Sequence, residues 1–441
     1  MSARLLAPVG CMLASLVAAQ APAKISLDDA IARAKQYSGQ IQSANLAALQ
    51  AREDTVQARA NRLATVNAFN QYIYTEGNGT PSGVFVANDG VHVYNEQAVV
   101  HQDLLSLARR GEINRALASE AIAQARVEIA ARGLNATVIQ DYYAIVSAER
   151  RLVNTTNSVQ EAERFLDITQ KQEKGGEAAH ADVIKAQLDL QQRQRDLKDA
   201  QVAIDKAKIA LGVLIFPNLN SQFEVVDDLA QLTPPVPVET QTAAAANPDV
   251  KSAQAGVREA QYEIEIARYQ YLPSFALDVF VGIDANQFAF QSVHADDTGR
   301  GTLPNFVAPE RQNFGYSAQA TLNIPVWNWG ATRSKVKQAE LKRDQAKADL
   351  SMAERTFQAN LATAQAEAQA AQAQLDSLRD SSRLAAESLR LTVLRYQAGE
   401  ATALEVVDAQ NTLTQSRNAY DDGLSRYAQA LANLKSLTGK F

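Results

Sequence analysis

This chain of 441 residues contains a single cysteine and has no excess of basic charge. Its 43 Lys and Arg residues are outnumbered by 49 Asp and Glu residues, which gives a net charge of −6 at pH 7. A protein that holds nucleic acid needs basic residues to neutralise phosphates, so nucleic acid is not expected as a partner. Hydrophobic residues make up 46% of the chain, which excludes an intrinsically disordered protein.

The single cysteine, Cys11, lies in segment 1–21, which has the features of a secretory signal peptide. Arg4 precedes an apolar run, residues 5–19, and small residues suited to cleavage follow. Cleavage after Ala19 is preferred over cleavage after Ala21, because Pro22 would follow the second site. We interpret Cys11 as an ordinary signal-peptide residue and not as a lipidation site, since only a very short apolar stretch precedes it. The mature chain would have left the cytoplasm and would contain no disulfide.

Sequence features of catalysis and of helical membrane insertion are also lacking. No run outside the signal peptide approaches 18 consecutive apolar residues, so no transmembrane helix is expected. No phosphate-binding loop or nucleophile motif occurs. The histidines are scattered and none has metal-ligand spacing; they are His92, His101, His180 and His294. We therefore predict no catalytic residue, no cofactor and no metal site.

Proline is absent from two long stretches, residues 103–172 and 330–397. A helix of about 70 residues would be roughly 105 Å long, far longer than a helix of an ordinary globular domain. Apolar residues at alternating steps of three and four indicate coiled-coil seams. One seam comprises Val183, Ala186, Leu190, Arg193, Leu197, Ala200, Ile204, Ala207 and Leu211. A second comprises Val406, Ala409, Leu413, Ser416, Tyr420, Gly423, Tyr427, Ala430, Leu434 and Leu437, and a similar run occupies residues 346–378.

The chain repeats itself. Residues 176–190 return 223 positions later as residues 399–413, and seven of the fifteen pairs are identical. Such recurrence means that one structural unit is written twice. We divide the chain into a signal peptide (1–21), a first repeat (22–212), an inter-repeat linker (213–248) and a second repeat (249–441). Each repeat is expected to contain a helix, two strands, a long helix and a further helix.

The expected strands alternate apolar and polar residues. In the second repeat they cover residues 274–284 and 313–324, and a weaker pair in the first repeat covers residues 66–75 and 91–100. Their length and alternation match transmembrane β-strands, with the apolar face toward lipid and the polar face toward a lumen. Four strands cannot close a barrel alone, so the chain would supply strands to an oligomer. Trp327 and Trp329 follow the last strand and fit an aromatic girdle at the membrane interface, although packing at a bend is the alternative.

Taken together, these features resemble the TolC family of outer-membrane efflux and secretion ducts. The resemblance rests on the tandem order of elements, on a glycine at each helix-to-helix turn, and on the pairs Asp182-Val183 and Glu405-Val406 that follow. It implies a mixed α/β membrane protein: a homotrimer whose four strands per protomer close a 12-stranded outer-membrane β-barrel, continued by a long α-helical coiled-coil tunnel across the periplasm. The linker would join a belt around the middle of the tunnel.

The resemblance also implies a gate at the periplasmic tip. Glu405 and Asp408 match acidic residues that ring the entrance, Asp182 matches a gate residue of the first repeat, and Tyr396 matches a gate tyrosine. An arginine that locks the gate in the best-known member is replaced here by Ala401. The alternative for Glu405 and Asp408 is a solvated helix start that is favourable near the helix dipole.

The turns at Gly176 and Gly399 would form the tip that meets a periplasmic adaptor protein. The resemblance implies an inner-membrane transporter of the RND, ABC or MFS type as the further partner, and outer-membrane lipid around the barrel. The expected function is a passive exit duct of a tripartite efflux or type I secretion system. The alternative is a structural or adhesive coiled-coil protein of the periplasm or cell surface without a pore. The cargo, whether drugs, metals or proteins, is not encoded in this chain.

Overall fold

The computed structural model describes residues 23–73, 93–218, 222–229, 246–286 and 314–438. The expected signal peptide and the connections between the expected strands of each repeat, including His92 and His294, lie outside these residues. Up to the linker, the elements are β1 (Ala23–Ile25), α1 (Leu27–Tyr37), α2 (Gly39–Ala60), β2 (Thr65–Ile73), β3 (Val93–Leu105), α3 (Leu107–Gly175) and α4 (His180–Ile215). After it follow β4 (Phe223–Val225), α6 (Pro248–Tyr269), β5 (Ser274–Asn286), β6 (Phe314–Asn323), α7 (Ala331–Gln397) and α8 (Ala403–Leu437).

The two helices expected from the scarcity of proline are present as single elements. Helix α3 has 69 residues and α7 has 67. The seam positions of α4 and α8 are buried or partly buried along both helices, as the heptad spacing predicts. In the described part of the chain, no helix contains a segment whose length and hydropathy would allow it to span a membrane.

Contacts divide the chain into two compact units that do not coincide with the sequence repeats. The first unit contains residues 1–42, 130–243 and 359–441, and the second contains residues 43–129 and 244–358. Each unit therefore combines parts of both repeats. Helices α3 and α7 each contribute to both units, because residues 129 and 358 lie within them.

The first unit has a core in which the N-terminal and linker segments pack on the helices. Strand β1 pairs in parallel with β4, which joins the start of the first repeat to the inter-repeat linker. Tyr142 of α3 is fully buried beneath this pair, and its hydroxyl donates to the carbonyl oxygen of Val226 at 2.7 Å. The same cluster contains Ile25, Leu211 and Phe223. The inter-repeat segment is thus anchored on α3.

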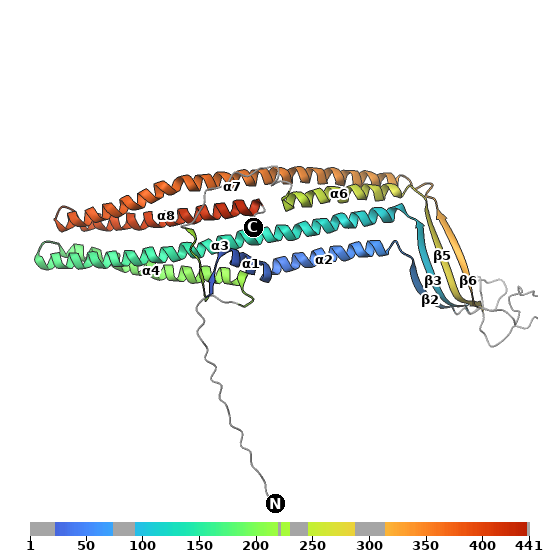
Figure 1. The fold of residues 1–441 in the computed structure, drawn as a ribbon, viewed down its shortest axis with the longest axis horizontal. Coiled ribbons are helices and arrows are strands. Elements are labelled where there is room, and N and C mark those ends of the chain that lie inside the picture. Colours follow the sequence, from blue (N-terminus) through green and yellow to red (C-terminus); the bar gives the residue numbers. More distant parts are fainter. Residues whose placement is uncertain (1–22, 74–92, 219–221, 230–245, 287–313, 439–441) are drawn as a thin grey trace, which may run out of the picture. The chain divides into compact units, whose positions relative to one another are not determined.

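The second unit contains a four-stranded antiparallel sheet in the order β2-β3-β5-β6 (Figure 1). Each strand pairs with its sequence neighbour within the described residues, and the central pair β3–β5 joins the two repeats. Strands β2 and β6 are the two edges. Strand β3 continues to Leu105, five residues beyond the end expected from the sequence, with a register shift between Asp103 and Leu105.

The register sorts the side chains of the sheet by polarity, because residues paired across strands share one face. One row pairs Val66, Val100, Val279 and Ala318, and the next pairs Ala68, Ala98, Val281 and Tyr316. On the other face, Thr65, His101, Asp278 and Gln319 form a row. One face of the sheet is therefore mainly apolar and the other mainly polar.

Candidate functional site

The two helix-to-helix turns of the first unit have the same backbone structure. Gly176 has a φ of 78° and Gly399 a φ of 76°, both in the left-handed region that favours glycine. The N–H of Glu400 donates to the carbonyl of Arg395 at 2.8 Å and that of Gly399 to the carbonyl of Tyr396 at 3.0 Å, which defines a Schellman motif. The bonds from Gly176 and from the residue after it repeat this pattern. Each glycine ends one long helix and turns the chain into the next.

Glu405 lies in the first turn of helix α8 and is held within that turn. Its backbone N–H donates to the Thr402 hydroxyl at 3.3 Å, and its Oε1 accepts from the Thr402 N–H at 3.2 Å. These reciprocal bonds form a capping box. Its Oε2 lies 3.5 Å from Nη1 of Arg395. The helix-start interpretation of Glu405 thus describes its contacts within one protomer.

Asp408 differs from Glu405 although it lies one helical turn further on. It is exposed, and among the described residues its carboxylate has neither a hydrogen bond nor an ion pair. The two residues share one side of α8, because positions three apart are neighbours on a helix. Only Asp408 therefore presents an unpaired charge.

Tyr396 lies at the contact between the two helical hairpins. It is only 5% exposed, and its ring meets that of Phe165 edge to face with the centroids 5.2 Å apart. Burial raises the pKa of the Tyr396 hydroxyl, the negative charge of Asp182 raises it further, and Thr169 lowers it. The structure therefore brings Tyr396 of α7 near Asp182 of α4. Ala401 packs against the same apolar cluster.

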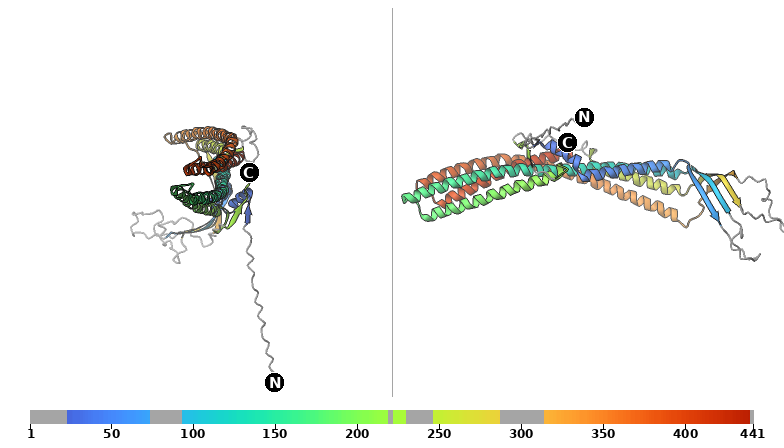
Figure 2. Two further views of the ribbon diagram at one scale, coloured as in Figure 1. Left: turned by 90° about the vertical axis from the view of Figure 1, so that its left-hand side faces the viewer. Right: turned by 90° about the horizontal axis from the view of Figure 1, so that it is seen from below.

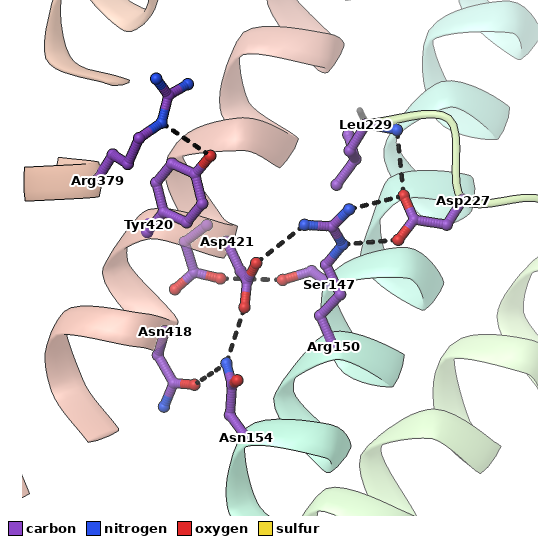
Figure 3. A network of polar contacts seen from close by, with 10 residues as sticks. Ser147, Arg150, Asn154, Asp227, Leu229, Arg379, Asn418, Tyr420 and Asp421 are labelled. Atoms are coloured by element: carbon purple, nitrogen blue, oxygen red, sulfur yellow. Dashed lines mark hydrogen bonds and ion pairs between the residues drawn. The ribbon is translucent and has the colours of Figure 1, made fainter. Parts of the chain in front are cut away.

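A polar network fixes the linker beside the helices (Figure 3). Arg150 of α3 donates to both carboxylate oxygens of Asp227 in the linker, at 2.7 and 3.0 Å, and to Asp421 of α8 at 3.0 Å. Asp421 also accepts from the amide of Asn154 at 2.7 Å. One arginine thus connects three segments that are far apart in the sequence. No sequence motif predicts this network, because its residues come together only when the helices and the linker pack.

In the second unit, the sheet lacks a covering layer within the described residues. Every residue of β6 is exposed, and so are residues 65–72 of β2. Large apolar side chains at the strand-to-helix junctions are exposed as well: Leu63, Leu104, Leu105, Tyr271, Leu272, Val326, Trp327 and Trp329. The two tryptophans are 75% and 89% exposed, and their rings contact each other edge to face. Packing at a bend would cover these rings, and in this protomer they are not covered.

The polar face of the sheet carries a charged chain of contacts that sequence patterns did not reveal. His101 Nδ1 lies 2.6 Å from a carboxylate oxygen of Asp278, and His101 Nε2 lies 3.5 Å from Asp103. Asp103 in turn accepts from Arg109 Nε at 3.2 Å. These contacts link strands β3 and β5 to the start of α3. The strand register places the histidine opposite the aspartate.

Comparison with known proteins finds similarity to outer-membrane efflux proteins. Residues 240–440 match the family described as outer membrane efflux protein. The cobalt-zinc-cadmium resistance protein CzcC of Cupriavidus metallidurans is 23% identical over 337 residues, which are 75% of this chain and 74% of that protein. These matches point to TolC-like outer membrane efflux proteins. The outer membrane protein OprJ of Pseudomonas aeruginosa is 25% identical over 72% of this chain and 63% of its own length.

Solved structures share the fold of this chain. The outer membrane protein VceC of Vibrio cholerae superposes with a TM-score of 0.77, at 18% identity over 94% of this chain and 96% of that chain. The outer-membrane channel OprN gives a TM-score of 0.80, at 16% identity over 94% of this chain and 89% of that chain. The matched family is described as an outer membrane efflux protein and OprN as an outer-membrane channel, which favours a duct over a coiled-coil rod without a pore.

Proposed function

We propose that this protein is the passive outer-membrane exit duct of a tripartite efflux or type I secretion system. Three copies would assemble as a homotrimer and close one 12-stranded β-barrel from four strands each. An inner-membrane transporter of the RND, ABC or MFS type would deliver the cargo through a periplasmic adaptor protein. The chain itself would perform no chemistry.

The observation that carries this proposal is the uncovered two-faced sheet. Strands β2 and β6 pair on one side only among the described residues, and exposed sheet edges are strong templates for a further strand. An exposed apolar face of this kind marks a surface that a partner protein or a membrane covers. Edge pairing between copies would remove both edges, and lipid would cover the apolar face. Strands β2 and β6 run in opposite directions, as antiparallel closure requires.

The helices give independent support for assembly. Besides its buried seam, α4 carries a second apolar stripe whose members are 44–64% exposed: Ile184, Leu188, Val202, Ile209 and Val213. Leu188, Val202 and Ile209 are separated by multiples of seven residues, which is the spacing of a coiled-coil seam. A seam that the described residues of its own protomer leave exposed fits contact with a second copy in a ring.

The turn end of the first unit would be the periplasmic entrance. Asp182, Tyr396, Glu405 and Asp408 would act at the gate, and the turns at Gly176 and Gly399 would contact the adaptor. Their support is the backbone identity of the two turns and the proximity of Asp182 to Tyr396. Trp327 and Trp329 would lie at the membrane interface, where amphipathic rings are favoured.

The cargo would be selected by the transporter that delivers it. The relatives support this division of labour, because one is named a cobalt-zinc-cadmium resistance protein and another an outer-membrane channel. A passive duct needs no binding site for its cargo, only a path that is wide enough and has suitable charge.

The test is assembly and conductance of the full chain extracted from outer membranes. We expect a detergent-solubilised particle with the protein mass of three chains by multi-angle light scattering, and discrete single-channel steps in a planar bilayer. Detergent alone, at the same dilution, is the control for conductance. A monomer that washes off membranes without detergent would overturn the proposal.

A further inference from the structure

We infer that Arg395 is a specificity-determining residue of the duct, because it neutralises Glu405 and leaves Asp408 as the effective charge of the acidic entrance. This inference rests on the proposed function and deepens it. It changes the expectation from the sequence, in which Glu405 and Asp408 both belong to the acidic ring at the entrance. A trimeric entrance would then present three effective negative charges in place of six.

Both carboxylate oxygens of Glu405 have partners within their own protomer. Its Oε1 accepts hydrogen bonds from the N–H and the hydroxyl of Thr402, both at 3.2 Å, and its Oε2 faces Arg395 Nη1 at 3.5 Å. Both carboxylate oxygens are therefore directed into the turn of the same protomer. The side chains of Arg395 and Glu405 are about half exposed, at 54% and 46%, so their ion pair adds little to the stability of the fold. Arg395 can neutralise the charge of Glu405 without stabilising the fold.

The turn around Gly399 holds the side chain of Arg395 in place. Its Nη2 donates to the carbonyl oxygen of Glu400 at 3.0 Å, while its own carbonyl accepts from the Glu400 N–H at 2.8 Å. The guanidinium is thereby tied to the Schellman turn around Gly399. A planar guanidinium with several donors can hold the turn and the carboxylate together, which a lysine ammonium cannot do equally well.

The first repeat provides an internal comparison. The offset of 223 residues aligns Gln172 with Arg395, Asp182 with Glu405, and Lys185 with Asp408. Arg395 and the acidic residue Asp408 thus occur together in the second repeat. At the aligned positions the first repeat has neither an arginine nor an acidic residue. The two turns have the same backbone, so this difference lies in the side chains alone.

The physical argument concerns the range of the field. An ion pair with its charges a few ångströms apart acts on a distant ion as a dipole, whose field falls faster than that of a single charge. Asp408 is exposed, and its carboxylate has no ion-pair partner among the described residues. In a hole narrower than the screening length of about 8 Å, three unpaired carboxylates would dominate ion selection.

The experiment measures reversal potentials of single channels under a KCl gradient for the full chain and four variants. We expect Asp408→Asn to lower the cation-to-anion permeability ratio by about threefold, and Glu405→Gln to leave it nearly unchanged. Glutamine preserves the capping box, so Glu405→Gln removes charge without removing the helix start. Arg395→Gln should raise the ratio by exposing Glu405. The double variant Arg395→Gln/Glu405→Gln should return it to the value of the unaltered chain.

The outcomes separate this inference from the proposed duct. Equal losses of selectivity in Glu405→Gln and Asp408→Asn, with no change in Arg395→Gln, would overturn the role of Arg395 while leaving the pore intact. A folded trimer of the unaltered chain that passes no current would overturn the duct itself, and the inference with it. Circular dichroism and trimer mass of each variant verify that a lost signal does not reflect misfolding. The double variant and Arg395→Gln lack the same arginine contact to the turn, so a difference in permeability ratio between them reports the charge of Glu405.

Discussion

The backbone conformation at position 399, and not side-chain contacts, requires a glycine there. A Cβ at this position would meet nothing within 4 Å, yet its φ of 76° disfavours any residue with a side chain. We expect Gly399→Ala to destabilise the turn by about 1–2 kcal/mol. Hydrogen exchange of the α7–α8 turn in the detergent-solubilised protein measures this, because local opening should increase there first.

The matched control for that substitution is Gly175, which occupies the last position of α3. A Cβ there would meet only Glu177, at 4.0 Å, and the backbone is helical. Gly175→Ala should therefore be neutral or stabilise by up to about 1 kcal/mol, while Gly176→Ala, at a φ of 78°, should destabilise. Equal effects at positions 175 and 176 would contradict the left-handed turn.

The partly buried carboxyl of Asp141 predicts that the stability of the fold falls as the pH rises. Its carboxyl is partly buried on α3, and burial raises its pKa. The folded chain then holds this proton more tightly than the unfolded chain, so stability is lost as the pH rises from the ordinary carboxyl range, near 3.9, through the raised pKa. Asp141→Asn should match the unaltered chain at low pH and exceed its thermal midpoint at neutral pH.

The control for the pH series is Asp167→Asn, on the same helix. Asp167 is exposed and pairs with Lys171 at 2.7 Å, so its loss should be nearly neutral or slightly destabilising at neutral pH. Thermal midpoints between pH 4 and pH 8, in one detergent and at constant ionic strength, give the comparison. A midpoint for Asp141→Asn below that of the unaltered chain at pH 8 would refute the sign.

At the scale of elements, one arginine contributes to the attachment of the linker to α3. The bidentate contact of Arg150 with Asp227 requires a planar guanidinium, and the N–H of Leu229 donates to the same carboxylate at 3.1 Å. We expect Arg150→Lys to keep the charge but to weaken this contact by about 1 kcal/mol, since the pair is partly exposed. Faster hydrogen exchange of residues 222–229 would report it.

Arg151 supplies the control for the linker, because it is the exposed neighbour of Arg150 on the same helix. Arg151→Lys should leave hydrogen exchange in residues 222–229 unchanged. If both lysine variants behave alike, the linker is held by β1–β4 pairing and the Tyr142 hydrogen bond, and the arginine is dispensable.

The elements also show where sequence reasoning succeeds and where it stops. Long helices follow from the lack of proline and from heptad spacing, which are local properties, and α3 and α7 have the expected extent. Strands β1 and β4 have three residues each and exist only because they pair with each other across about 200 residues, so no local pattern predicts them. The break between α1 and α2 at Ser38 is likewise not predicted, because no proline marks it.

The site divides in the same way. The tip glycines were predictable, because the repeat aligns them and a left-handed helix end requires glycine. The partner of Glu405 was not, since Arg395 meets it only after the turn has folded. The contact of Phe165 with Tyr396 joins helices from different repeats, and packing alone creates it. Spacing reveals which residues share an element, but it does not reveal which elements meet.

At the scale of the whole molecule, the proposed barrel requires β6 of one protomer to pair with β2 of the next. The chain has one cysteine, Cys11, so a Cys11→Ser background gives a clean system for disulfide trapping. In that background, Asn67→Cys in β2 combined with Ser317→Cys, Gln319→Cys or Thr321→Cys in β6 places both thiols on the polar face. Within one protomer two strands separate these positions, whereas between neighbours they would be adjacent.

We expect at least one of these pairs to yield covalent dimers and trimers on mild oxidation of membranes, because a disulfide forms only when the Cβ atoms lie within about 4.5 Å. The matched control is Ala68→Cys with the same β6 partners: neighbouring residues of a strand point to opposite faces, so its thiol would lie on the apolar side. Cross-links from Ala68→Cys as strong as those from Asn67→Cys would indicate random collision. Monomers from every pair would show that the edges do not meet, and the sheet would then need another cover for its apolar face.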